Sequence, residues 1–166
     1  MRRDEFREFV AARSPALTRT AFLLTGDWQL AEDLLQTALM RCYGHWSRID
    51  VPEAYVRRAM VTAVVGWRRR RWHGELPTAA MPDQATADED VADLVCLRAD
   101  LLRLLHDLGP RQRAVLVLRF YEDLSESEVA AMLGVSVGTV KSQTSRALAR
   151  LREAPEVWAR IQEVAR

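Results

Sequence analysis

The feature that most constrains this fold is the pattern of caps and turns near the C-terminus. Ser125 and Glu128 have the spacing of a capping box, which opens a helix. Gly134 supplies a sharp turn at the end of that helix, and Ser136 is placed to cap the next one. Two short helices that cross through a tight turn form a helix-turn-helix, whose second helix can enter the major groove of DNA.

The second helix of this unit has two contrasting faces. Its apolar stripe, which must pack on the preceding helices, consists of Val140, Thr144, Ala147, Leu148 and Leu151. The opposite face is short and polar, with basic flanks: Ser142, Ser145, Arg146 and Ala149, beside Lys141 and Arg150. Arginine reads guanine edges and serine reads several bases, so this face favours DNA recognition. The alternative is a plain helical hairpin with a solvated face, which would more usually carry Glu and Lys.

Most of the remaining chain has helical periodicity. Apolar residues recur at spacings of three and four over 6–24, again from Leu30 to Ala38, and from Tyr55 to Trp67. Pro52 suits the first turn of the third helix, and a further helix is expected over 91–108, closed by Gly109 and Pro110. Because no stretch alternates with period two between hairpin turns, we predict an all-α fold without a sheet.

Charge is unevenly distributed along the chain. Residues 1–75 carry 13 basic and 9 acidic side chains, residues 76–107 carry 2 and 7, and residues 108–166 carry 9 and 7. The stretch 77–90 has two prolines, few large apolar residues and several acids, so it cannot bury enough surface to fold alone. We therefore predict two small helical domains, 1–75 and 96–166, joined by a flexible acidic linker over 76–95.

Several classes of protein are not expected. Cys42 and Cys96 lie far apart without CxxC spacing, and the charged start MRRDEFREFV lacks the apolar core of a signal peptide. We therefore expect a cytoplasmic location, and the short apolar runs predict no membrane span, which would need about 20 residues. Enzymatic motifs such as GxGxxG, a P-loop or HExxH do not occur. Cys42 and His45, one helical turn apart, lack a second ligand pair, so neither a metal nor a cofactor is expected.

The motifs together resemble one protein family. The stretch LSESEVAAMLGVSVGTVKSQTSRALARLR resembles region 4 of bacterial sigma factors. TAFLLTGDWQLAEDLLQTALMRCYGHW, followed by PEAYVRRAMVTAVVGWRRRR, resembles region 2. The short chain, with no room for a third globular region, is similar to the extracytoplasmic-function (ECF) group of the sigma-70 superfamily, and the LLTGD and LAEDL phrases resemble its sigma-E type.

This resemblance implies a function in transcription initiation. In that family, region 2 binds the RNA polymerase core and melts the minus-10 promoter element, and region 4 reads the minus-35 element and binds the flap of the beta subunit. The implied partners are the beta and beta-prime subunits of the polymerase core and promoter DNA, with an anti-sigma protein as a further candidate. A sigma factor performs no chemistry itself, so no catalytic residue is expected.

The resemblance also implies particular site residues. The residues implied for polymerase contact are Asp33, Gln36 and Arg41, and Thr37 occupies a position where the family usually has Glu. Minus-10 recognition falls on Arg57, Arg58, Thr62, Trp67, Arg68 and Arg69, with Thr62 standing near the position where the family often has Asn. Minus-35 recognition falls on Ser136, Thr139, Lys141, Ser142, Ser145, Arg146 and Arg150.

Physical reasoning supports the region 2 assignment independently. An unpaired strand is held by basic side chains along its backbone and by aromatic faces that stack on its bases. Trp67, Trp72 and the run 68–71 interleave these two residue types. Trp28 and Trp46, by contrast, are expected in the core. The acidic linker could act as a tether, or it could cover a basic surface in the absence of polymerase.

Two other classes of protein remain as alternatives. A response regulator also ends in a helix-turn-helix with a Thr-Val-Lys phrase, but it needs a receiver domain with clustered aspartates, whereas residues 1–75 offer helices and arginines. A protein that only sequesters polymerase would not need the Ser142 to Arg146 face.

Overall fold

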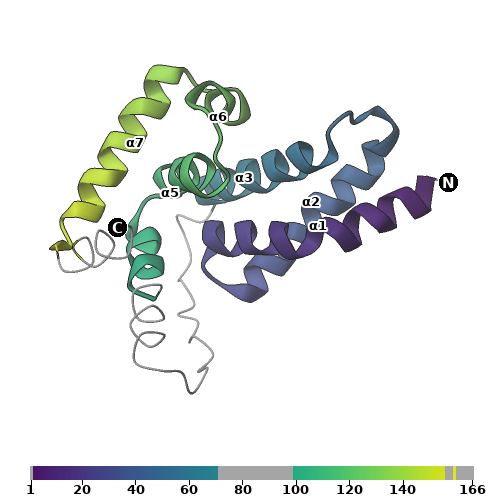
Figure 1. Ribbon diagram of the computed structural model, residues 1–166, viewed down its shortest axis with the longest axis horizontal. Coiled ribbons are helices and arrows are strands. Elements are labelled where there is room, and N and C mark those ends of the chain that lie inside the picture. The colour runs from purple at the N-terminus through teal and green to yellow at the C-terminus, as the bar shows by residue number, and fades with distance from the viewer. Residues whose placement is uncertain (1, 71–98, 156–158, 160–166) are drawn as a thin grey trace, which may run out of the picture.

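The computed structural model describes residues 2–70, 99–155 and 159, and throughout these residues the elements are helical (Figure 1). In chain order the elements are α1 (Arg2–Thr25), α2 (Trp28–His45), the 3-10 turn η1 (Trp46–Arg48), α3 (Pro52–Arg70), α5 (Pro110–Leu116), the π-helical turn η2 (Val117–Tyr121), α6 (Glu126–Leu133) and α7 (Val137–Arg152). Residues 99–107 form a further helix before α5. The all-α prediction is confirmed, and the acidic linker and Trp72 lie outside the described residues.

Helices α1, α2 and α3 form the N-terminal unit. Their predicted apolar stripes are buried, with Leu17, Ala21 and Leu24 of α1 against Leu34 and Ala38 of α2 in one cluster. The α1–α2 turn uses Gly26 at a φ of +73°, a left-handed conformation that favours glycine. The Asp27 carboxylate then accepts a hydrogen bond from the Leu30 amide at 2.8 Å and so caps α2.

The C-terminal unit contains the predicted helix-turn-helix. Ser125 accepts from the Glu128 amide while the Glu128 carboxylate accepts from the Ser125 amide, so the capping box is confirmed. Gly134 ends α6 at a φ of +66°, and the Ser136 hydroxyl accepts from the Thr139 amide to cap α7. Helix α7 buries Val140, Ala147 and Leu151, as its apolar stripe predicts.

The two units pack directly on one another, an arrangement that the sequence did not reveal. Helix α3 contacts α5 and α6, and α1 contacts η2, as Figure 1 shows in part. Val115, Leu118 and Val129 of the second unit belong to the same buried cluster as Leu17 and Met60 of the first. The core is therefore continuous across the predicted domain boundary.

The turn at Gly26 lies at this junction and offers a test of the packing. A Cβ added at Gly26 would fall 1.1 Å from Cε1 of His106, whereas a Cβ at Gly134 would meet nothing within 4 Å. Gly134→Ala should therefore show only the left-handed backbone cost of about 1–2 kcal/mol. Gly26→Ala should lose more stability than Gly134→Ala, because the His106 imidazole must also move. Urea denaturation measures the free energy of unfolding of both variants. Adding His106→Ala should recover part of the Gly26→Ala loss, and no recovery would contradict this contact.

The same histidine predicts a pH dependence of stability. Burial, helped by the neighbouring Arg113 guanidinium and opposed by Asp107, lowers the pKa of His106 below its usual value. The unfolded chain then binds the proton more readily, so stability is full above the unfolded pKa of about 6.5 and declines as the pH falls from there toward the folded value. Thermal melting between neutral and mildly acidic pH should show this decline, and His106→Asn should flatten it. An unchanged slope in that variant would assign the decline to other groups.

Candidate nucleic-acid interface

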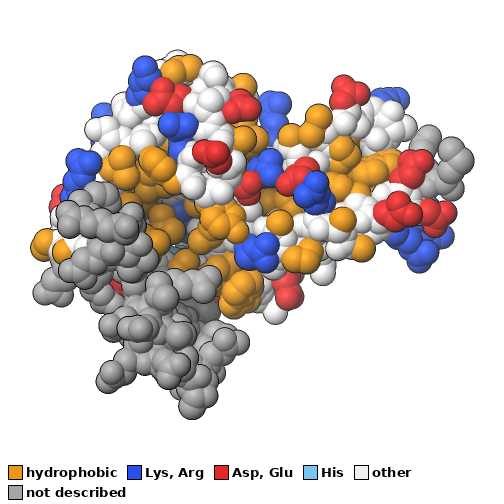
Figure 2. All heavy atoms as spheres, viewed as in Figure 1, with side chains coloured by type: hydrophobic (Ala, Val, Ile, Leu, Met, Phe, Trp, Pro, Cys, Tyr) orange, Lys and Arg blue, Asp and Glu red, His pale blue; other side chains and the backbone are white. Residues whose placement is uncertain are grey.

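The outer face of α7 is open to solvent along its length. Lys141, Ser142, Ser145, Arg146 and Arg150 are all exposed, and only Thr139 among the predicted minus-35 residues is half-buried. Figure 2 shows basic side chains along the edge of the molecule formed by this part of the chain. Lys141 lies 3.8 Å from the Glu126 carboxylate of α6 and keeps a side-chain exposure of 64%. The exposed face combines short polar side chains with basic ones, a composition that favours contact with DNA bases and phosphates.

Hydrogen bonds organise the first turns of α7. Ser136 and Thr139 share a hydroxyl–hydroxyl bond of 2.9 Å in addition to the capping bond. The Ser142 hydroxyl donates to the Thr139 carbonyl at 3.0 Å, so its hydrogen points back toward the helix. In this arrangement Ser142 presents acceptor lone pairs outward, which suits the exocyclic amino group of adenine or cytosine.

The predicted minus-10 residues lie on two different faces of α3. Arg58 and Thr62 are exposed, and Gly66 continues this open stripe one turn later. Arg57 points toward the side of the helix that also carries Val61, which is fully buried. Successive helical residues are about 100° apart, which is why the adjacent arginines separate. Trp67, Arg68 and Arg69 belong to α3, but their side chains lie outside the described residues.

Arg57 is held in a network of ion pairs. Its Nη2 lies 2.7 Å from Oε1 of Glu53, and its Nε lies 2.8 Å from Oε2 of Glu122 in the second unit. The other carboxylate oxygen of Glu122 accepts from the buried Thr20 hydroxyl. Arg13 extends the network on the solvent side, with its Nε 3.2 Å from Glu53. The predicted DNA contact at Arg57 is thus engaged within the protein.

The outer face of α2 carries the predicted polymerase-binding residues. Asp33, Gln36 and Arg41 are all exposed. Met40, which sequence reasoning missed, lies one turn beyond Gln36 and is 75% exposed. A large apolar side chain within a polar helix face is a common anchor of protein interfaces. The signal was available in the sequence, because Met40 falls on the same stripe as Gln36 at a spacing of four.

Other candidate sites are less developed. Within residues 2–70 and 99–155 no group of three or more His, Cys, Asp or Glu side chains could hold a metal ion. Cys42 is buried, which raises the pKa of its thiol, and the His45 ring bonds to the Arg41 carbonyl at 3.0 Å. No helix in the described ranges has the length and apolar character needed to span a membrane.

Trp46 packs on Phe6 and Phe9 as expected, but the expectation that Trp28 lies in the core was wrong.

Trp28 instead lies at the surface. It is 46% exposed and stacks on Phe22 with ring centroids 4.0 Å apart. It is the first residue of α2, which begins at Trp28. The aromatic content of the N-terminal unit is therefore divided between the core and the surface.

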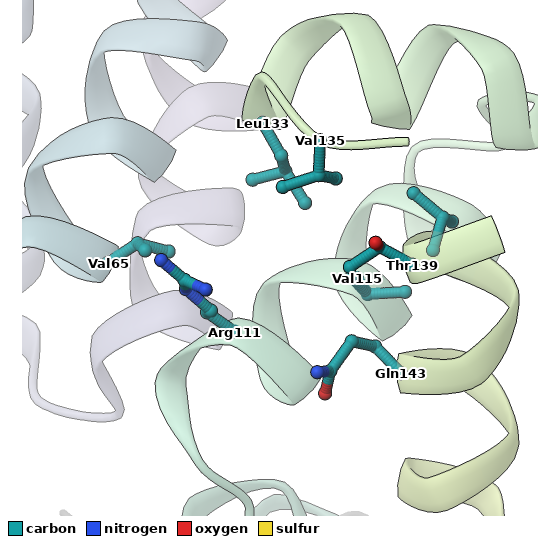
Figure 3. A pocket seen from close by; sticks show the side chains of 8 residues that line it. Val65, Arg111, Val115, Leu133, Val135, Thr139 and Gln143 are labelled. Carbon is teal, nitrogen blue, oxygen red and sulfur yellow. The ribbon is translucent and has the colours of Figure 1, made fainter. Parts of the chain in front are cut away.

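A small pocket lies where α3 meets the helix-turn-helix. Figure 3 shows Val65 of α3 and Arg111 of α5 facing Leu133 and Val135 of the α6–α7 turn, with Gln143 of α7 at the far side. Its volume of about 40 Å³ is too small for a nucleotide or a cofactor. The pocket is a packing gap between the two units.

Comparison with known proteins agrees with this division into units. The Sigma-70 region 2 family matches residues 9–73, and Sigma-70, region 4 matches residues 104–153. The RNA polymerase sigma-E factor of Streptomyces avermitilis is 48% identical over 154 residues, which cover 90% of this chain and 84% of that protein. The ECF RNA polymerase sigma factor SigL of Mycobacterium tuberculosis is 33% identical, covering 82% of this chain and 80% of that protein.

Two solved structures share the fold. The sigma factor RpoE from Bartonella quintana, in complex with the anti-sigma factor NepR, matches with a TM-score of 0.72 at 24% identity, covering 92% of this chain and 98% of that chain. CnrH, in complex with the cytosolic domain of CnrY, matches with a TM-score of 0.63 at 23% identity, covering 93% and 89%. With regions 2 and 4 in the same order and sigma-E relatives that match along most of the chain, this protein belongs to the ECF group of the sigma-70 family, the RNA polymerase sigma factors that direct promoter-specific initiation of transcription.

Proposed function

We propose that three surfaces of this chain divide the work of a sigma factor. The α2 face around Asp33, Gln36 and Met40 binds the polymerase core, and the open stripe of α3 at Arg58 and Thr62 binds the melted minus-10 strand. The outer face of α7 reads the minus-35 element. The observation that carries the proposal is that all three surfaces are open in the structure and occur within the matched sigma regions.

The proposal explains how a chain without catalytic groups acts on DNA. Strand separation requires that the factor bind the unpaired strand better than the duplex, because a protein that binds both forms equally shifts nothing. Basic and hydroxyl side chains on α3 supply that preference by holding phosphates and base edges. The chain would then act in the cytoplasm, where polymerase is found, and catalyse no reaction of its own.

An anti-sigma protein is part of the proposal. One solved structure that shares this fold is a sigma factor in complex with the anti-sigma factor NepR, and another is CnrH in complex with the cytosolic domain of CnrY. By analogy we propose that such a partner binds this chain and competes with polymerase. The α2 face is the surface that both would use, since its exposed Met40 offers an apolar anchor.

The α3 stripe predicts a defect in promoter opening. Arg58→Ala should leave assembly with core polymerase intact and reduce open complexes on a duplex promoter, because the unpaired strand loses a cationic contact. A premelted bubble should partly rescue the variant. Permanganate reactivity of unpaired thymines measures opening. Arg7→Ala, at an exposed site at the far end of α1, is the matched control. An equal loss on premelted and duplex templates would place Arg58 in binding rather than in opening.

Footprinting of the assembled holoenzyme tests the division of labour as a whole. Wild-type holoenzyme should protect both promoter elements. A Ser142→Ala/Arg146→Ala variant should lose protection at the minus-35 element while polymerase binding persists. Gln36→Ala should weaken polymerase binding itself. Loss of core binding in the α7 variant would contradict the assignment of α7 to DNA.

A further inference from the structure

The contact between Arg57 and Glu122 joins the two sigma regions across a long stretch of chain. Both carboxylate oxygens of Glu122 engage region 2, one on Arg57 and the other on the Thr20 hydroxyl. The side chains of Arg57 and Glu122 are only 17% and 11% exposed. An ion pair so little exposed is screened less by water and salt than a surface pair. The contact therefore has the character of an interface anchor.

The segment that presents Glu122 has an unusual backbone. It begins with the π-helical turn Val117–Tyr121, in which the Glu122 amide donates to the Val117 carbonyl at 3.0 Å. Asp123 follows at a φ of +53°, and no other non-glycine residue among those described has a positive φ. Such conformations cost energy and persist where the surroundings compensate. Around this turn the Leu124 amide donates to the Leu118 carbonyl within region 4, and Glu122 contacts Arg57 and Thr20 of region 2.

Docking of region 4 covers one face of α3. Arg57 lies on this face, Val61 is fully buried, and Val65 borders the small pocket against Leu133 and Val135. The opposite stripe, with Arg58 and Thr62, remains exposed. Among the minus-10 candidates whose side chains are described, Arg57 is thus withdrawn from solvent while Arg58 and Thr62 stay exposed.

The docked arrangement is too short to reach both promoter elements. Elements centred near minus 35 and minus 10 lie about 25 base pairs apart, or about 85 Å at 3.4 Å per base pair. In the structure α3 contacts α6, which packs on α7, so the two reading helices are separated by roughly two helix diameters, about 20–24 Å. One chain in this form cannot occupy both elements at once.

We infer that the free factor is closed by its own region 4, with Glu122 occupying Arg57 in place of a DNA phosphate, and that this contact must open before both promoter elements are bound. The occupant of the Arg57 face is therefore the segment Val117–Leu124 of the same chain. The consequence for promoters rests on the proposed function, but the closed state itself does not.

Arg113 shows which contacts survive opening. It donates to the carbonyls of Leu105 and His106 within region 4 and to the Leu24 carbonyl at the end of α1. Opening removes the bond to Leu24 and leaves the bonds within region 4. Glu122 instead directs its carboxylate entirely to region 2. Substitution of Glu122 is accordingly the more selective way to open the chain.

Energy transfer within the free chain tests the inference. Dyes at Ser47→Cys and Ala131→Cys, both exposed sites, report the separation of the two regions in a Cys96→Ser background. Cys42 is buried and labels slowly. Glu122→Gln keeps the shape and can still accept from Thr20, but it removes the ion pair. Its transfer efficiency should fall, and its affinity for single-stranded DNA should rise several-fold. Glu8→Gln, the same charge change at an exposed site, should match the wild-type protein.

Charge reversal gives the second arm of the test. Arg57→Glu alone should open the chain, and Arg57→Glu combined with Glu122→Arg should restore the high transfer efficiency. Thermal melting checks that each variant remains folded. A Glu122→Gln chain with the transfer efficiency of Glu8→Gln, or a reversed pair that stays as open as the single variant, would overturn the inference.

The result also separates this inference from the proposed function. Transfer efficiency is measured without polymerase or a promoter, so an opened Glu122→Gln chain supports the closed state even where transcription fails. Transcription that proceeds normally while the chain never closes overturns the inference and leaves the proposed function standing. Added core polymerase should lower the transfer efficiency of the wild-type chain, and an unchanged value would overturn the requirement for opening.

Discussion

Replacing Arg146 by alanine is expected to abolish preference at one base pair of the minus-35 element. Arg146 is exposed near the middle of the outer face of α7, beside Ser142, where a guanidinium can reach a guanine edge. The loss should be about 1–3 kcal/mol on the preferred sequence and small on a sequence mutated at that base pair. Competition binding of holoenzyme to matched and mismatched sites measures the difference.

Arg150→Ala is the control for this experiment. Arg150 lies one turn nearer the C-terminal end of α7, and we predict that it contacts phosphate. Its loss should weaken all sequences alike and reduce the salt dependence of binding, because one fewer counterion is released. Equal losses on matched and mismatched sites for both variants would contradict the assignment of Arg146 to base reading.

The second large effect is expected at the α2 face. Met40→Glu should weaken assembly with core polymerase by at least about tenfold, since an unpaired carboxylate would be buried in an apolar contact, and tenfold corresponds to about 1.4 kcal/mol. Met40 is 75% exposed in the free chain, so the substitution should leave stability almost unchanged. Fluorescence anisotropy of the labelled factor with core polymerase, in the absence of DNA, measures the affinity.

Val51→Glu provides the matched control for Met40. Val51 is 61% exposed in the loop before α3 and is not part of α2. The same apolar-to-acidic change there should not alter core binding. If both variants bind core polymerase like the wild-type chain, Met40 is an ordinary surface residue and the proposed interface is misplaced.

Local rules of sequence account for most of the individual elements. The capping box at Ser125, the glycine turn at Gly134 and the cap at Ser136 were predicted and confirmed, because each depends on a few neighbouring residues. The buried stripe of α7 follows from helical period alone. The same period defines the opposite, exposed face, and the resemblance to region 4 implies that this face recognises the minus-35 element.

Sequence reasoning failed where the surroundings in the folded chain decide the exposure and the partners of a side chain. Arg57 and Arg58 were grouped by their basic character, yet one is paired with Glu122 and the other is exposed. No local pattern indicates that Glu122 meets Thr20, 102 positions earlier in the chain. Trp28 was expected in the core, but at the first turn of α2 it is 46% exposed.

The packing of region 4 on region 2 belongs to the same class of feature. The acidic stretch suggested two independent units, and the charge pattern gave no signal for a shared core. That core depends on Val65, Val115 and Val129, whose apolar character is equally compatible with packing inside one unit. Contacts between distant segments require the three-dimensional arrangement.

The most direct test of the central claim is in vitro transcription from a genomic library with core polymerase alone and with this chain added. The account predicts new start sites that share two sequence motifs at a fixed spacing. The upstream motif should lose its influence in the Arg146→Ala variant, and the Arg58→Ala variant should produce fewer transcripts from all of these start sites. An unchanged set of start sites on addition of the chain would contradict promoter recognition by this protein.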